Sequence, residues 1–231
     1  MALLLNIDTA TEHASVCLSK HADVLGLIES KEQKNHASFI QVAIQQLMIN
    51  CGYQLKDIDA VTVTAGPGSY TGLRVGLASA KGICYALNKP LIMVNTLEVM
   101  AQSILTHYQS TNQPINASTF LCPLIDARRM EVFTALYDPS LKGIEPPHAL
   151  IIDEHSFEAL LQIHKIVFSG TGYPKLKEII SAPNASFLPI QHNASHLAIR
   201  AITAYQSERF ANLAYSEPLY VKEFFNPAEK A

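Results

Sequence analysis

Apolar residues along the chain fall into short runs, typical of buried strands, and into spaced patterns, typical of helices. In the first half, the runs predict strands near residues 2–8, 14–20, 22–29, 60–65 and 91–94. The spaced patterns predict helices over residues 35–51, 71–88 and 96 to about 107. Strands that alternate with helices indicate an α/β fold.

A polar segment from Tyr108 to Asn116, which contains Pro114, separates this half from a second one. There the pattern predicts strands near 118–126, 130–138 and 165–168, and helices from about 155, over 173–180 and over 194–211. The proline-containing stretch after residue 138 is predicted to be a loop, and residues 217–225 an apolar tail that packs down. We therefore predict two domains, residues 1–108 and 117–231, the second smaller and degenerate.

The two halves share a weak internal repeat. Leu5-Asn6-Ile7-Asp8 resembles Pro123-Leu124-Ile125-Asp126, and in each case a strand ends in Asp and the chain turns back. Later, residues 63–68 resemble residues 167–172, where a strand ends in a Gly-x-Gly turn before a helix. This repeat predicts two lobes that face each other across a cleft, with both Asp-bearing turns at its mouth. Actin and the sugar kinases have this architecture.

The most distinctive stretch is Gly-Pro-Gly-Ser-Tyr-Thr-Gly-Leu-Arg-Val-Gly at residues 66–76. Free amides at the helix start that follows it would attract an anion, but the Lys-Ser/Thr pair of a phosphate loop is missing. Glycines weaken an isolated helix by about 1 kcal/mol each, so this helix needs packing. Its line of small residues has two interpretations that can hold together: close packing on its own sheet, or a second buried face against a partner chain. We favour the interpretation in which a partner chain covers the second face of this helix.

Composition narrows the class of protein. With 48% hydrophobic and 16% charged residues, the chain is typical of a globular protein, and its net charge of −3 does not indicate nucleic acid. The N-terminus reaches Asp8 without a basic segment, so no signal peptide is predicted. Four cysteines scattered in apolar patterns indicate buried thiols in a reducing cytoplasm. Arg74 and Lys81 exclude a membrane span in the glycine-containing helix.

Four segments resemble the TsaB (YeaZ) family: residues 7–9, 66–76, 125–133 and 217–220. The resemblance implies an α/β actin-like ATPase (ASKHA) fold with two duplicated lobes, whose mixed sheets are flanked by helices. It also implies a non-catalytic role in the machinery that makes N6-threonylcarbamoyladenosine (t6A) at position 37 of tRNA.

The same resemblance implies the partners. These are TsaD, the paralogue that transfers the threonylcarbamoyl group, and TsaE, which joins through the TsaB–TsaD complex. ATP and metal would belong to TsaD and TsaE, and tRNA would be bound only as substrate of the complex. The chain alone would form a homodimer in the cytoplasm, away from membranes. The interface would use the helices at 35–51 and 71–88, with the candidate residues His36, Ile40, Ile44, Thr71, Gly72, Val75, Gly76, Ser79, Ala80 and Ile83.

A local comparison bears on catalysis. TsaD proteins carry His-x-x-x-His after the strand that follows the glycine-containing helix, whereas this chain has Thr96 and Met100 at the two positions. Neither side chain suits the Fe or Zn ion that imidazoles bind. Thr96 is predicted to cap a helix that opens with a capping box. We therefore predict no catalytic residue and no metal site in this chain.

A set of polar and glycine residues remains as candidates for anion or nucleotide contact: Asp8, Thr9, Gly66, Gly68, Ser69, Asp126 and Arg128. For Asp8 and Thr9 we favour a turn that caps strands. For Asp126 with Arg128 and Arg129 we favour a surface salt-bridge group, with anion or tRNA contact as the alternative. If Asp8, Gly68 and Asp126 surround a nucleotide, the chain is instead a small actin-like kinase or ATPase.

Three histidines need a separate interpretation. His192 and His196 have the spacing of a metal pair, but no third ligand stands near, so we predict exposed histidines at a helix start. His36 caps the first helix or contacts the partner. No Ser-His-Asp order with a Gly-x-Ser-x-Gly elbow is present, so no protease nucleophile is predicted.

Overall fold

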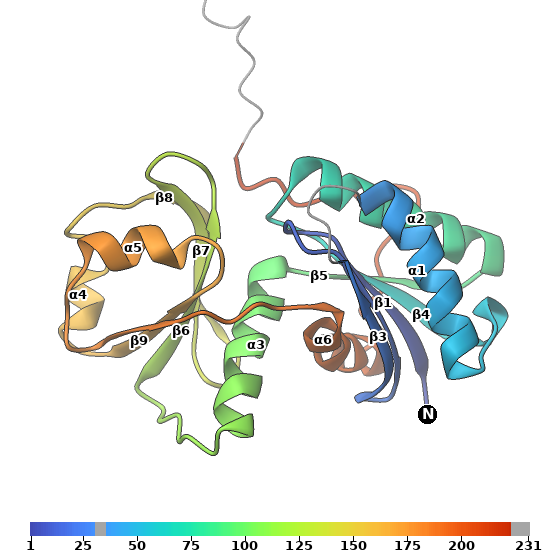
Figure 1. The fold of residues 1–231 in the computed structure, drawn as a ribbon, viewed down its shortest axis with the longest axis horizontal. Helices are drawn as coiled ribbons and strands as arrows, with labels where there is room; N and C mark the ends of the chain where they lie inside the picture. The colour runs from blue at the N-terminus through green and yellow to red at the C-terminus, as the bar shows by residue number, and fades with distance from the viewer. Residues whose placement is uncertain (31–35, 223–231) are drawn as a thin grey trace, which may run out of the picture.

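The computed structural model describes residues 1–30 and 36–222. It contains two lobes that lie side by side, each built on a five-stranded mixed sheet (Figure 1). The first sheet has the order β3-β2-β1-β4-β5 and consists of β1 (Leu3–Asp8), β2 (Ser15–Lys20), β3 (Asp23–Glu29), β4 (Ala60–Thr64) and β5 (Leu91–Val94). The second has the order β8-β7-β6-β9-β10 and consists of β6 (Thr119–Asp126), β7 (Glu131–Tyr137), β8 (Gly143–Ile151), β9 (Lys165–Ser169) and β10 (Ala185–Leu188).

The two sheets have the same topology. In each, the central strand pairs antiparallel with the next strand of a meander and parallel with a later strand: β1 with β2 and β4, and β6 with β7 and β9. The glycines that follow the equivalent strands also match, because Gly66 has a φ of +108° and Gly170 a φ of +103°. The predicted duplication and the α/β class, with two mixed sheets flanked by helices, are therefore confirmed.

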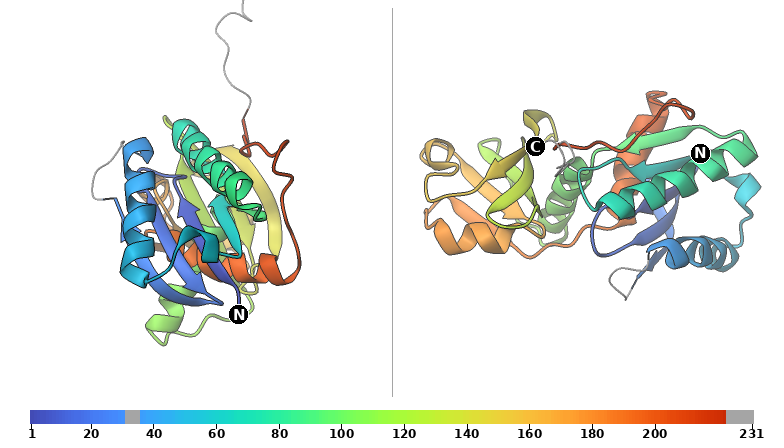
Figure 2. Two further views of the ribbon diagram at one scale, coloured as in Figure 1. Left: turned by 90° about the vertical axis from the view of Figure 1, so that its right-hand side faces the viewer. Right: turned by 90° about the horizontal axis from the view of Figure 1, so that it is seen from above.

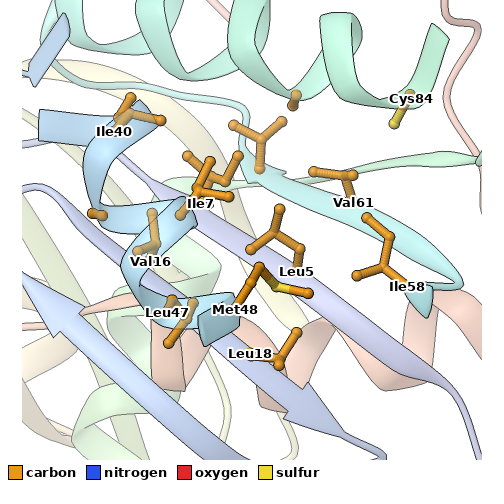
Figure 3. Close-up of a cluster of buried hydrophobic side chains, with 14 of the residues drawn as sticks. Leu5, Ile7, Val16, Leu18, Ile40, Leu47, Met48, Ile58, Val61 and Cys84 are labelled. Atoms are coloured by element: carbon orange, nitrogen blue, oxygen red, sulfur yellow. The ribbon is translucent and has the colours of Figure 1, made fainter. Parts of the chain in front are cut away.

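Helices cover both faces of the first sheet. On one face lie α1 (His36–Cys51) and α2 (Tyr70–Leu87), side by side (Figure 2). Their apolar sides meet β1, β2 and β4 in a fully buried cluster that includes Ile7, Ile40 and Val61 (Figure 3). The opposite face is covered by α6 (Ala194–Gln206). No helix in the described ranges combines the length and apolarity that a bilayer crossing requires.

The predicted domain boundary does not match the two lobes. Although α6 belongs to the second half of the chain, its Leu197 and Ala201 pack with Leu4 of the first sheet. Conversely, α3 (Thr96–Ser110) belongs to the first half, but Leu97 and Ile104 share a core cluster with the second sheet. The lobe around the first sheet therefore includes α6 from residues 117–231, and the lobe around the second sheet includes part of α3 from residues 1–108. Helical periodicity predicts that a face is buried, but it does not specify which sheet covers it.

Two strands were missing from the sequence prediction. Residues 143–151 form β8 and not a loop, although they contain Pro146 and Pro147. The prolines are tolerated because β8 is an edge strand that pairs only with β7. The short β10 lies at the opposite edge. The short helix predicted over 173–180 is confirmed as α5 (Tyr173–Ile179), whereas two other helices are shorter than predicted: α4 spans only Glu158–Leu161, and α6 ends at Gln206.

The C-terminal segment packs down as predicted, as far as the structure describes it. The Leu219 amide donates a hydrogen bond to the Ala65 carbonyl at 2.7 Å, and Arg74 Nε donates to the Tyr220 hydroxyl at 3.0 Å. Lys222 then pairs with Glu131 of the second lobe at 2.8 Å. Residues 223–225 of the predicted tail, like residue 35 of the predicted first helix, lie outside the described residues.

The four thiols differ in burial, which predicts their reactivity. Burial raises the pKa of Cys17 and of Cys122 to about 12 and that of Cys84 to about 11. Cys51 is only partly buried, and burial raises its pKa less strongly. Because the thiolate is the nucleophile, we expect iodoacetamide at pH 8 to modify Cys51 first in the native protein. Peptide mass spectrometry measures this, and equal labelling of Cys17 or Cys122 would contradict the packing.

Candidate functional site

A cleft of about 1180 Å³ lies between the lobes. Its first-lobe wall consists of the β1–β2 turn, the start of α1 and the glycine turn, that is Ala10, Thr11, Glu12, His36, Ala37, Gly68, Ser69, Tyr70, Thr71, Gly72 and Val75. Its second-lobe wall consists of the β6–β7 turn and the start of α5, that is Ile125, Asp126, Ala127, Arg128, Arg129, Phe133, Thr171 and Lys175. Of the seven residues predicted for anion contact, four line the cleft: Gly68, Ser69, Asp126 and Arg128.

The glycine turn uses several of its amides for its own structure. The Gly66 amide donates to Thr96 Oγ1 at 3.1 Å, the Ser69 amide to the Ala10 carbonyl at 2.7 Å, and the Gly72 amide to Ser69 Oγ at 3.3 Å. A phosphate cradle needs amides that point at the ligand. These three amides are occupied, so the turn is built as a structural joint.

Three small residues of α2, Gly72, Gly76 and Ala80, face their own lobe. A Cβ at Gly72 would lie 2.2 Å from the Thr9 carbonyl oxygen, and a Cβ at Gly76 would lie 2.2 Å from Thr9 Oγ1. Ala80 is fully buried in the core of the same lobe. Thr9 Oγ1 also donates a hydrogen bond to the Gly72 carbonyl at 2.8 Å. The close approach that these residues permit is therefore between α2 and the end of β1.

The two Asp-bearing turns differ, contrary to the prediction that both lie at the mouth of the cleft. Asp8 is completely buried, and its Oδ1 accepts hydrogen bonds from Thr64 Oγ1 at 3.0 Å and from the Ala10 amide at 3.1 Å. Its Oδ2 lies 3.3 Å from His192 Nε2. Asp8 thus caps its strand, as favoured from the sequence, and it also pairs with a histidine from the segment before α6.

The prediction of exposed histidines at residues 192 and 196 is wrong. Only 5% of His192 is exposed, since it packs against Asp8. His196 is half-buried, its Nδ1 accepts a hydrogen bond from the Asn193 amide at 3.1 Å, and burial lowers its pKa. No group of three or more His, Cys, Asp or Glu within the described ranges is arranged to hold a metal ion.

The second Asp-bearing turn lies in the cleft and is stabilised differently from the prediction. Asp126 Oδ1 accepts hydrogen bonds from Lys175 Nζ and from the Arg128 amide, both at 2.6 Å. Arg128 and Arg129 are exposed, and neither forms an ion pair with any residue in 1–30 or 36–222. The salt bridge of this turn is therefore Asp126 with Lys175, and among the described residues it includes neither arginine.

Similarity to known proteins identifies the family to which this chain belongs. A family model described as "TsaD: tRNA N6-adenosine threonylcarbamoyltransferase" matches residues 12–223. The tRNA threonylcarbamoyladenosine biosynthesis protein TsaB of Escherichia coli is 34% identical over 174 residues, which are 74% of this chain and 71% of that protein. The chain belongs to the TsaB (YeaZ) family.

Two further similarities agree with this family. The TsaB protein of Bacillus subtilis is 31% identical over 134 residues, which are 58% of this chain and 54% of that protein. The solved structure of YeaZ from Pseudomonas aeruginosa superposes with a TM-score of 0.79 at 23% identity, over 95% of this chain and all of that one. The structural likeness concerns the fold.

The two positions that carry histidines in TsaD proteins are packed at the junction of the lobes of this TsaB-family chain. Thr96 Oγ1 accepts the Gly66 amide, and the side chain of Met100 lies against Gly170. The cap of α3 is Asn95, whose side chain accepts from the Leu97 amide at 2.9 Å, so the predicted cap at Thr96 is wrong. Glu98 forms no capping box here, because it pairs with Arg200 at 2.6 Å.

The predicted TsaB-family interface residues divide into two groups. Six of them are buried, although two of these, His36 and Gly72, line the cleft: His36, Ile40, Ile44, Gly72, Gly76 and Ala80. Four are exposed or half-exposed: Thr71, Val75, Ser79 and Ile83. His36 Nε2 donates a hydrogen bond to the Thr11 carbonyl at 2.9 Å, and the side chain lies in the wall of the cleft.

Sequence reasoning missed the exposed apolar residues of these helices. Val42 is 67% and Ile49 is 65% exposed on α1, and Tyr85 is exposed on α2. The signal was present, because the 16 residues of α1 include no Asp, Glu, Lys or Arg. An exposed helix face without a charge is unusual for a solvated surface.

Proposed function

We propose that this chain is a non-catalytic partner subunit of t6A biosynthesis that binds TsaD and, through TsaD, TsaE. The observation that carries the proposal is the uncharged exposed face of α1 beside α2. Val42 and Ile49 stand seven residues apart on that face, and both are mostly exposed. Exposed apolar groups that gather on one face mark protein interaction sites.

The neighbouring helix extends this face. Gln41 Nε2 donates a hydrogen bond to Ser79 Oγ at 3.2 Å, which holds α1 and α2 together at the surface. Next to Ser79 on α2 lie Val75 and Ile83, each partly exposed. The C-terminal segment covers a different side of α2, where it contacts Arg74 and Lys81. The α1–α2 face is thus left uncovered by the described residues.

The proposed occupant of this face is a chain of the same fold. The family model that matches the chain is described as the transferase TsaD, so a paralogue would carry an equivalent pair of helices. Two such pairs can pack in a four-helix arrangement around a shared two-fold or pseudo-two-fold axis. A homodimer in the absence of TsaD follows from the same surface.

The proposal that the chain is not itself catalytic rests on its own residues. Thr96 and Met100 carry no imidazole and are occupied in packing against the two glycine turns. Three amides of the residue 66–72 turn already have acceptors within the chain. We therefore expect isothermal titration with Mg-ATP to detect no tight binding and no turnover by the isolated protein. Tight binding with turnover would favour the alternative of a small ATPase or kinase.

A glutamate on the α1–α2 face tests the partner role. We expect Ile49→Glu to reduce co-purification with TsaD at least tenfold, because the charge must be desolvated in the interface. The matched control is Ile163→Glu, since Ile163 is 75% exposed on the second lobe. Both variants should keep the wild-type melting temperature. Equal retention of TsaD by the two variants would refute the assignment of this face.

A further inference from the structure

The segment after α6 forms a strap that runs from the first lobe to the second. We use this name for residues 211–222, and Figure 2 shows them crossing between the lobes. The strap begins where the Ala211 amide donates a hydrogen bond to the Leu91 carbonyl at 2.8 Å, at the edge of the first sheet. It ends where Lys222 Nζ lies 2.8 and 2.9 Å from the two carboxylate oxygens of Glu131, at the start of β7. The strap therefore links the two lobes.

The first lobe holds the strap through several independent contacts. Lys81 Nζ donates a hydrogen bond to the Ser216 carbonyl at 2.9 Å, and the Leu219 amide donates to the Ala65 carbonyl at 2.7 Å. A Cβ built at Gly66, whose φ is +108°, would lie 2.5 Å from the Leu219 carbonyl oxygen. Only glycine allows the strap backbone to approach so closely at this position. The glycine turn is therefore shaped to receive the strap.

An aromatic contact holds the strap next to the cleft. The ring of Tyr220 lies against the ring of Tyr70, with the two centroids 5.3 Å apart, and Tyr70 lines the cleft. The Arg74 guanidinium lies 4.1 Å from the centre of the Tyr70 ring, and its Nε donates to the Tyr220 hydroxyl at 3.0 Å. Ring–ring and cation–ring contacts are favourable beyond the apolar area that they bury. The strap is therefore expected to move with the first lobe.

The attachment of the strap to the second lobe is much weaker. Within residues 1–30 and 36–222, the hydrogen bonds and ion pairs between the strap and the second lobe are those of Lys222 with Glu131. The side chain of Lys222 is 60% exposed and that of Glu131 is 17% exposed. An ion pair that is open to water is weak and is screened by salt. The strap is therefore expected to release at its second-lobe end first.

The lobes also meet at α3, which is a natural pivot. Through Thr96 and Met100, the first turn of α3 contacts the glycine turns of both lobes. Tyr137, at the other end of β7 from Glu131, packs in the same core cluster as α3. Domains that are connected within one chain move relative to each other by default. A second link at the far end of β7 limits that motion.

We infer that the strap is a latch that sets the width of the cleft between the lobes. While Lys222 is paired with Glu131, the strap holds the glycine turn of the first lobe near the β6–β7 turn of the second, and the cleft keeps its volume of about 1180 Å³. When the pair breaks, the strap stays on the first lobe and the lobes open about α3. The latch thus controls how far a ligand can enter the cleft. The inference concerns contacts within the chain and does not depend on the proposed partner role.

Single-molecule energy transfer between dyes on the two lobes measures this opening in the full chain. The dyes are attached at Lys56→Cys and Ile163→Cys, both at exposed positions, with Cys51→Ser to remove the partly buried native thiol. We expect Lys222→Glu to shift the ratio of closed to open molecules about fivefold towards open, which is the scale of one exposed ion pair. Raising the salt concentration from about 0.1 M to about 1 M should shift the wild type in the same direction.

A swapped pair and a matched control test the latch. Lys222→Glu combined with Glu131→Lys restores an ion pair with reversed charges and should recover the wild-type ratio. The control is Lys177→Glu, which makes the same charge change at an exposed position of α5 outside the cleft lining and should leave the ratio unchanged. An unchanged ratio in Lys222→Glu refutes the latch. An equal shift in Lys177→Glu, or an open swapped variant, refutes it as well.

The first-lobe end of the strap supplies a second test. Tyr220→Ala removes the ring that packs on Tyr70 and should also open the cleft, whereas Tyr220→Phe keeps that ring and should open it less. Wild-type ratios in both Tyr220→Ala and Lys222→Glu would show that the strap does not set the width of the cleft. None of these measurements includes TsaD. Failure to bind TsaD would therefore refute the partner role alone, and a cleft of fixed width would refute the latch alone.

Discussion

Replacing Gly76 with alanine is expected to lower the free energy of unfolding by about 2–4 kcal/mol, as overpacking in a close-packed core does. The added Cβ would lie 2.2 Å from Thr9 Oγ1 and 3.4 Å from a methyl group of Val63. Thr9 is held in turn by its hydrogen bond to the Gly72 carbonyl. Relief of the clash therefore requires α2 to move away from the end of β1.

The matched control lies on the same helix. Gly82 is exposed, and apart from its own stretch of helix no described atom lies within 4 Å of a Cβ built there. Gly82→Ala should therefore raise the free energy of unfolding by up to about 1 kcal/mol, through helix propensity alone. Urea denaturation followed by circular dichroism measures both variants. A Gly76→Ala variant as stable as the wild type would show that α2 does not pack as described.

This result bears on how the partner surface is tested. Because Gly76 faces Thr9 and Ala80 is fully buried, larger side chains at these positions would disturb the fold itself. Loss of TsaD binding by such variants would not locate an interface. Substitutions on the exposed side of α1, at Val42 and Ile49, separate binding from stability.

Removal of the Asp8 carboxylate is expected to destabilise the protein by about 3 kcal/mol or more. In Asp8→Ala, His192 would keep its buried position but lose its partner at 3.3 Å. Thr64 Oγ1 and the Ala10 amide would lose their acceptor as well. Breaking a buried pair by removing one partner is costly because the other partner stays buried and unpaired.

The internal repeat supplies the control for this prediction. Asp126 occupies the equivalent position of the second lobe, but its side chain is 39% exposed and its partner is Lys175. An exposed ion pair contributes about 1 kcal/mol or less, so Asp126→Ala should have a small effect on stability. Chemical denaturation of the two variants in parallel measures the difference. Equal destabilisation would mean that the two turns are structurally equivalent, contrary to the structure.

The contrast between the two aspartates also separates their roles. Asp8 connects the end of β1 to the segment that leads into α6, which belongs to the second half of the chain. Asp126 holds the turn that presents Arg128 to the cleft. A duplicated motif has therefore become structural in one lobe, while in the other it faces the cleft.

Much of this fold is determined by local sequence. Alternation and spacing of apolar residues predicted most strands and helices, because a buried strand face and a helical stripe are properties of neighbouring residues. The short repeat at Asp8 and Asp126 was enough to predict that the two sheets share one topology. Strand β8 was not predicted from the sequence because prolines are unfavourable within a sheet. They are tolerated here because β8 lies at the edge of its sheet.

The tertiary structure alone decided what each buried face meets. The glycine line of α2 indicated close packing, but only the three-dimensional fold shows that Gly72 and Gly76 pack on Thr9. The exchange of α3 and α6 between the lobes, and the pairing of His192 with Asp8, join residues far apart in the chain. The periodicity of apolar residues shows that one face of a helix or strand must be buried. It does not show what buries that face, because any apolar neighbour removes it from water equally well. The identity of the covering element depends on the path of the whole chain.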